Sequence, residues 1–160
     1  MPSLTNQADS LFSKYTNHTP GCMLAIIQDG NIVYQQGYGL EDLENAIPIS
    51  SDSVFYIAST SKQFTAASIL LLAQNSKLSL DDDICLHVPE MPIYNQPITI
   101  RHLIHHTSGL RDSLTLLDLA GVNVSEAVYN NADLIKLVAR QESLNFPPGA
   151  QYKYCNAGYL

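Results

Sequence analysis

Residues Phe55 to Leu72 read FYIASTSKQFTAASILLL. The apolar residues 54–57 precede a segment, from Thr60 to about Gln74, whose apolar residues would occupy most faces of a helix. A helix that is apolar nearly all round is typically buried. Ser59 or Thr60 is suited to cap its first turn. The stretch therefore predicts a buried helix with a serine at its N-terminus.

Ser59 and Lys62 have the S-x-x-K spacing of a known catalytic signature. Residues three apart on a helix share a face, so the Lys62 amine can reach the Ser59 hydroxyl. A serine hydroxyl needs a base to become a nucleophile, and the positive end of a helix stabilises the developing alkoxide. The four letters alone also fit the alternative of an ordinary helix cap beside a solvated lysine.

Upstream, the spacing of apolar residues predicts a helix from about Thr5 to Tyr15. Two Ile-, Val- and Tyr-rich runs follow, at 23–28 and 32–36, with Asp29-Gly30 between them. Asp-Gly between such runs is a strong hairpin signal because the turn requires positive φ. The polar stretch from Leu40 to Ser53 lacks periodicity and is expected to be a loop.

Downstream, helices are expected over Ile100–His106, capped by Thr99, and over Ala132–Arg140, capped by Ser125 or Asn131. We expect an α/β (α+β) fold, in which an antiparallel sheet is flanked by helices and joined to a mostly helical lobe at about 86–146. The hairpin and the start of the nucleophile helix occupy about 20–60. A lone hairpin is marginal in water, so residues 1–160 are interpreted as the N-terminal portion of a single domain, incomplete at the C-terminus.

Composition excludes several functions. Lys plus Arg number 8 against 15 Asp plus Glu, a net charge of −7, without a basic run; phosphate contacts need clustered cations, so no nucleic-acid partner is expected. The longest apolar runs are too short to span a membrane. No signal peptide is recognised, which favours a cytoplasmic location. Three cysteines without C-x-x-C argue against a disulfide framework.

A second candidate group is Tyr154-Cys155-Asn156. A phenol near cations can relay a proton, and the Asn156 amide can donate to a substrate carbonyl while accepting from Lys62. The Y-x-N spelling alone is unspecific, because it recurs at 15–17 and 129–131. Alternation along the chain points Cys155 away from its neighbours, so we interpret it as a buried thiol.

A histidine cluster offers a competing interpretation. His102, His105 and His106 have the i, i+3, i+4 spacing that suits zinc. No further carboxylate or cysteine ligand is fixed nearby by spacing. We therefore expect helix packing and loop hydrogen bonds here, with no metal and no organic cofactor.

Three sequence segments together resemble a known family. They are residues 55–72, ITIRHLIHHTSGL at 98–110 and PPGAQYKYCNAGY at 147–159. Their order and separation resemble the β-lactamase-related serine hydrolases, which include class C β-lactamases, D-alanyl-D-alanine peptidases and esterases. The resemblance implies a β-lactamase/transpeptidase-like fold and an acyl-enzyme at Ser59. It implies that Lys62 and Tyr154 share proton transfer and that Asn156 holds a small-molecule or peptide substrate by its amide or ester carbonyl.

The sequence departs from this family in one respect. The third motif, a triad that starts with Lys or His and ends with Gly on a late strand, is absent. That strand supplies the second oxyanion donor, so the chain is expected to be weakly active or inactive. The alternative is a non-catalytic truncated relative that serves as a binding or oligomerisation module, for example in a homo-oligomer. The motifs leave lactam, D-amino-acid peptide and ester substrates open.

Overall fold

The computed structural model of the chain describes residues 3–160. The chain divides into two compact units, Met1–Ile57 and Ala58–Leu160. Within residues 3–160, the first unit contains one helix and four strands, which pair antiparallel, and the second unit contains only helices among its regular elements. The predicted mixed α/β class with antiparallel sheet and helices is therefore confirmed. The assignment of residues 1–160 to a single domain stays a prediction.

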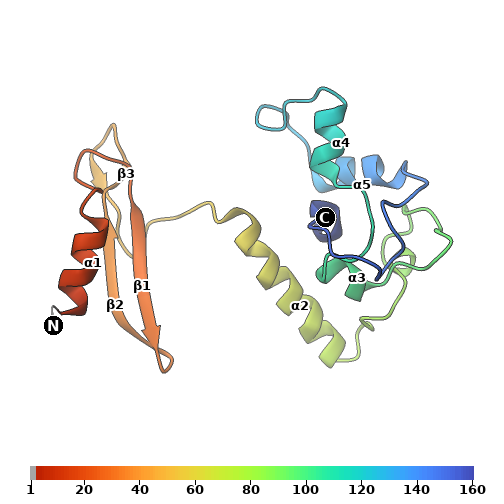
Figure 1. Cartoon of the computed structure of the whole chain (residues 1–160), viewed down its shortest axis with the longest axis horizontal. Coiled ribbons are helices and arrows are strands. Elements are labelled where there is room, and N and C mark those ends of the chain that lie inside the picture. The colour runs from red at the N-terminus through yellow and green to blue at the C-terminus, as the bar shows by residue number, and fades with distance from the viewer. Residues whose placement is uncertain (1–2) are drawn as a thin grey trace. The chain divides into compact units, whose positions relative to one another are not determined.

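The first unit is built on a hairpin of β1 (Cys22–Gln28) and β2 (Asn31–Tyr38). Asp29 and Gly30 at its tip have φ of 50° and 77°, which is the turn that the Asp-Gly signal predicts. Helix α1 (Leu4–Phe12) lies beside the hairpin (Figure 1) and ends three residues before the predicted boundary. The helix is fixed by the Asp9 carboxylate, which accepts a 2.9 Å hydrogen bond from the Tyr38 hydroxyl.

The stretch expected to be a loop contains a second, smaller sheet. Strands β3 (Leu40–Asp42) and β4 (Ile47–Pro48) pair antiparallel. The turn between them is closed by Asp42 Oδ1, which accepts hydrogen bonds of 2.9 Å from the backbone N–H groups of Glu44 and Asn45. The loop prediction was wrong in this part, because a side chain that closes a turn leaves no trace in hydrophobic periodicity.

The regular elements of the second unit are all helices, and loops connect them. Helices α3 (Ile100–Ile104), α4 (Ser113–Leu119) and α5 (Asn131–Ala139) gather near the end of the chain (Figure 1), which closes with the 3-10 turn η3 (Asn156–Tyr159). Another 3-10 turn, η2, spans Ile84–Leu86. The core of this unit comprises six buried residues: Ile84, Met91, Ile98, Leu110, Val138 and Cys155.

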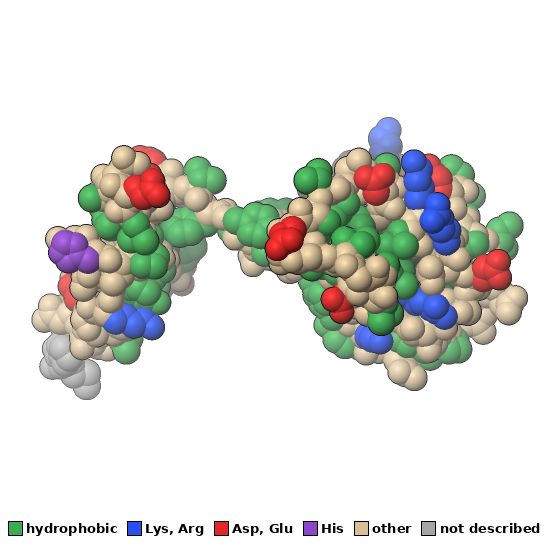
Figure 2. All heavy atoms as spheres, turned by 90° about the horizontal axis from the view of Figure 1, so that it is seen from above, with side chains coloured by type: hydrophobic (Ala, Val, Ile, Leu, Met, Phe, Trp, Pro, Cys, Tyr) green, Lys and Arg blue, Asp and Glu red, His purple; other side chains and the backbone are tan. Residues whose placement is uncertain are grey.

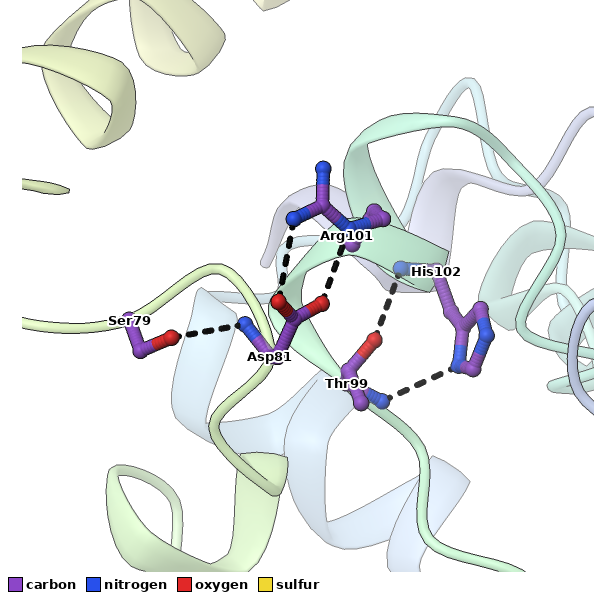
Figure 3. Close-up of polar contacts among 5 residues, drawn as sticks. All are labelled: Ser79, Asp81, Thr99, Arg101 and His102. Atoms are coloured by element: carbon purple, nitrogen blue, oxygen red, sulfur yellow. Dashed lines mark hydrogen bonds and ion pairs between the residues drawn. The ribbon is translucent and has the colours of Figure 1, made fainter.

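The chain enters α3 through polar contacts that Figure 3 shows. Thr99 Oγ1 accepts from the His102 N–H at 3.3 Å, and His102 Nδ1 accepts from the Thr99 N–H at 3.2 Å. The Arg101 guanidinium donates to both oxygens of Asp81, at 2.8 and 3.1 Å. The predicted Thr99 cap is confirmed. Helix α5 is capped by Asn130 instead of Ser125 or Asn131, because Asn130 accepts from the backbone one turn ahead.

The nucleophile helix differs from expectation. Its first turn is the 3-10 segment η1 (Ala58–Ser61), and α2 (Lys62–Gln74) follows. No residue of α2 is buried, and Phe64 and Leu71 are 62% and 58% exposed. Apolar side chains reach the surface at several places (Figure 2). The prediction of a buried helix was wrong, because among residues 3–160 no element packs closely enough on α2 to cover it. None of the helices at residues 3–160 combines the length and the apolar character needed to cross a bilayer.

Candidate active site

Ser59 lies in the 3-10 turn that leads into α2. The residue before it, Ala58, has φ of 46°, a left-handed conformation that costs an L-residue about 1–2 kcal/mol. Such strain is concentrated at functional turns. The tight turn places Ser59 and Lys62 on one side of the chain, as the S-x-x-K spacing predicts.

Hydrogen bonds connect the four predicted site residues into one group. Lys62 Nζ donates to Ser59 Oγ and to Asn156 Oδ1, each at 3.0 Å. The Tyr154 hydroxyl donates to Ser59 Oγ at 2.6 Å. The amine and the phenol thus contact the serine, and the amide contacts the amine, although Tyr154 and Asn156 follow their partners by 95 and 94 positions.

Tyr154 is the member of this cluster with altered acidity. The Lys62 ammonium beside the phenol lowers the pKa of Tyr154, and the hydrogen bond with Ser59 adds to this effect. Lys62 Nζ lies 5.1 Å from the centroid of the Tyr154 ring. The positive charge favours the phenolate, so Tyr154 can accept a proton at a lower pH than an isolated tyrosine does.

Asn156 is held by an aspartate that the sequence interpretation missed. Asp112 Oδ2 accepts from the Asn156 backbone N–H at 2.5 Å and from its side-chain amide at 3.1 Å. Because the amide nitrogen donates to Asp112, the amide oxygen faces Lys62. The other oxygen, Oδ1, caps α4 by accepting from the N–H groups of Leu114 and Thr115. An Asp followed by SLTLLDL is an N-cap signal that could have identified this residue.

The ring of His106 packs against the ring of Tyr154. The centroids of the two rings are 4.6 Å apart, and His106 Nδ1 accepts from the Cys155 N–H at 3.2 Å. Burial lowers the pKa of His106, which favours the neutral ring. This residue was considered only as part of a histidine cluster. His102 is committed to the Thr99 cap, and residues 3–160 contain no group of three His, Cys, Asp or Glu side chains arranged to hold a metal.

Cys155 takes the position expected for it. The side chain is 4% exposed, and its Sγ lies 3.6 Å from the Leu110 carbonyl oxygen. Burial raises the pKa of the thiol, which keeps it protonated and unreactive. The interpretation as a buried thiol between two outward-facing neighbours is confirmed.

Comparison with known proteins shows the family of the chain. The model of the β-lactamase family matches residues 8–160. Protein flp of Staphylococcus aureus (strain N315) is 31% identical over 98% of this chain, and the D-aminopeptidase of Brucella anthropi is 34% identical over 88%. The matches cover 32% and 26% of those proteins. The chain therefore spans about a third of the length of the curated relatives it matches.

A solved structure has a similar fold. The octameric penicillin-binding protein homologue from Pyrococcus abyssi superposes with a TM-score of 0.83 at 26% identity, covering 98% of this chain and 37% of that one. The match includes the segments that carry all four site residues. The chain belongs to the β-lactamase family.

Proposed function

We propose that this chain carries the nucleophilic half of a serine hydrolase that cleaves amide or ester bonds through an acyl-serine intermediate. The observation that carries the proposal is the pair of contacts at Ser59 Oγ, 3.0 Å from Lys62 Nζ and 2.6 Å from the Tyr154 hydroxyl. Both distances are within the reach that general acid–base catalysis requires.

In the proposed acylation step, Tyr154 as phenolate takes the Ser59 proton while Ser59 Oγ attacks the substrate carbonyl carbon. Lys62 stabilises the phenolate and the developing alkoxide by its charge. Collapse of the tetrahedral intermediate breaks the bond to the leaving amine or alcohol, and Tyr154 returns the proton to that group. Water then attacks the acyl-serine by the same route, which regenerates the Ser59 hydroxyl.

Asn156 is proposed to position the substrate. Its amide is oriented by Asp112 on one side and Lys62 on the other. The Ser59 backbone N–H is the proposed first oxyanion donor. Residues 1–160 do not include a Lys- or His-x-Gly strand, and the absence of one oxyanion donor costs about 10²–10³ in rate. We therefore expect a polypeptide of residues 1–160, assayed by itself, to be acylated slowly and to turn over weakly or not at all.

The substrate class follows from the relatives at a coarse level. The similarity to a D-aminopeptidase and to a penicillin-binding protein homologue supports a small molecule or peptide with an amide carbonyl. Ester, lactam and D-amino-acid peptide substrates share the required electrophilic carbonyl. All three are therefore proposed as members of one substrate class.

The test is covalent labelling of the 160-residue chain with a fluorophosphonate and with a penicillin, read by intact-protein mass and peptide mapping. We expect a single adduct on Ser59 that is lost in Ser59→Ala. Ser61→Ala is the matched control, since Ser61 occupies the same turn without a contact to Lys62 or Tyr154 among the hydrogen bonds described. Undiminished labelling of Ser59→Ala would show that another residue is the nucleophile.

A second candidate function, self-association, is favoured by the uncovered side chains of α2 and by the octameric relative. Exposed apolar patches of this kind mark contact surfaces. Light scattering during size-exclusion chromatography tests it, and Leu71→Ser should lower the measured mass if α2 is the contact. A monomer at all concentrations, for both forms, would eliminate this candidate.

A further inference from the structure

A cavity of about 410 Å³ opens beside the proposed catalytic group. Tyr154 and Asn156 form one side of it, and Arg111, Lys153, Thr115 and Asn145 are among the other lining residues. A group bound in this cavity is therefore adjacent to the phenol and amide that act on the carbonyl. Its chemistry bears on which substrates reach Ser59.

The two cations in this cavity have no carboxylate partner. Arg111 donates to neutral acceptors only, Gln141 Oε1 at 3.1 Å and Ser143 Oγ at 2.8 Å. Among residues 3–160, the ion pairs within 4 Å involve only Asp82 with His87 and Asp81 with Arg101. Arg111 is thus oriented without being neutralised, and Lys153 is exposed on the same cavity.

The one carboxylate of the cavity is already engaged. Asp112 accepts from Asn156 through Oδ2, and from Leu114 and Thr115 through Oδ1. These donors occupy both of its oxygens, so Asp112 is engaged by α4 and Asn156, and among residues 3–160 it forms no ion pair with either cation. The cavity therefore retains a net positive charge, with guanidinium N–H groups available to a planar anion.

From this arrangement we propose that the cavity is a subsite for a carboxylate of the substrate, bound by Arg111 and Lys153 while Ser59 attacks the carbonyl. The inference rests on the proposed function for its place in catalysis. It adds a preference for anionic over neutral substrates of the same shape, because a charge-assisted contact is stronger than a neutral one.

The kinetic test uses two esters of equal length, mono-4-nitrophenyl succinate and 4-nitrophenyl butyrate, which differ by a terminal carboxylate against a methyl group. Acylation transfers the acyl group to Ser59 Oγ and releases nitrophenolate, which is measured by absorbance. We expect the rate ratio of succinyl to butyryl ester to fall about tenfold in Lys153→Gln. The ratio should recover in Lys153→Arg and stay at the wild-type value in Lys77→Gln, which removes an exposed lysine outside the cavity.

A binding test separates the subsite from catalysis. In Ser59→Ala, titration with monomethyl succinate is followed by amide NMR and compared with methyl butyrate. We expect shifts at Arg111 and Lys153, and about tenfold tighter binding of the anion that is lost in Lys153→Gln.

The outcomes distinguish the two proposals. Acylation by both esters with an unchanged ratio in Lys153→Gln overturns the subsite and leaves the hydrolase standing. Absent acylation with preserved anion binding overturns the hydrolase and supports the subsite. Equal binding of monomethyl succinate and methyl butyrate in Ser59→Ala overturns the subsite whatever the acylation result.

Discussion

The hairpin of the first unit and the candidate active site of the second are held together over very different stretches of chain. In the hairpin, Gln28 pairs with Asn31 and Ile26 with Tyr34. In the site, Ser59 and Lys62 bond to partners 95 and 94 positions away. A local structure needs only local signals, whereas the site depends on the packing of a whole unit. We therefore expect single substitutions to disturb the site more than the hairpin.

The largest effect should come from Lys62→Met. Lys62 contacts Ser59 and Asn156 and lowers the pKa of Tyr154, so its loss disables three interactions together. We expect acylation by a fluorophosphonate to slow by about 10³. A labelling time course, quenched at intervals and analysed by intact-protein mass spectrometry, measures this rate. A loss below about tenfold would show that the long-range contacts are not cooperative.

Tyr154→Phe should have a smaller effect, about 10² in acylation rate, because Lys62 still reaches Ser59. The pH dependence should change as well. In the unaltered chain we expect the rate to rise as the phenolate forms, and because the pKa of Tyr154 is lowered, the rise should begin below the ordinary tyrosine value of about 10. Tyr154→Phe should lack this rise. A rise of equal size in both proteins would assign it to another group.

Asp112 allows the support of the site to be separated from the support of a helix. Asp112→Ala removes the cap of α4 and the acceptor for Asn156, and we expect a loss of about 2 kcal/mol in stability. Asp112→Asn retains a capping oxygen but opposes an amide to the Asn156 N–H groups. It should keep most of the stability while slowing acylation. Urea unfolding and labelling rates measure the two effects, and equal losses of stability in both variants would contradict the separation.

The smallest effect should be a matched pair of glycine changes. Gly30 and Gly121 both have φ of 77°, and a Cβ at either would meet no atom within 4 Å. Alanine at either position should cost about 1 kcal/mol from backbone strain alone. Gly30→Ala should lower only the unfolding transition of the first unit, and Gly121→Ala only that of the second. Hydrogen exchange resolved by residue provides the measurement. A loss of protection in both units from one change would show that they unfold together.

The sequence predicts the local parts of this molecule well. Asp29-Gly30 identifies the hairpin, and Thr99 identifies the start of α3, because turn and cap chemistry is contained in a few adjacent residues. The convergence of Ser59 with Tyr154 is not readable from spacing. It was expected only because three sequence blocks resemble a known family.

Other features could not be predicted for physical reasons. The composition of α2 indicates burial, yet Phe64 and Leu71 are exposed. Burial depends on which other elements pack on a helix, and the sequence of the helix does not specify them. The sequence around Asp112 indicates the cap of α4, but it does not indicate the contact with Asn156, 44 positions away. A contact between distant segments is visible only once both segments are placed.

The separation between Ser59 and Tyr154 has a consequence for the protein during its synthesis. Ribosomes add about 5–20 residues per second, so Tyr154 and Asn156 follow Ser59 by about 5–20 s. Throughout that interval the nascent chain displays Ser59 and Lys62 without the phenol that the proposed mechanism requires. We therefore expect the growing polypeptide to resist acylation until Tyr154 has been added.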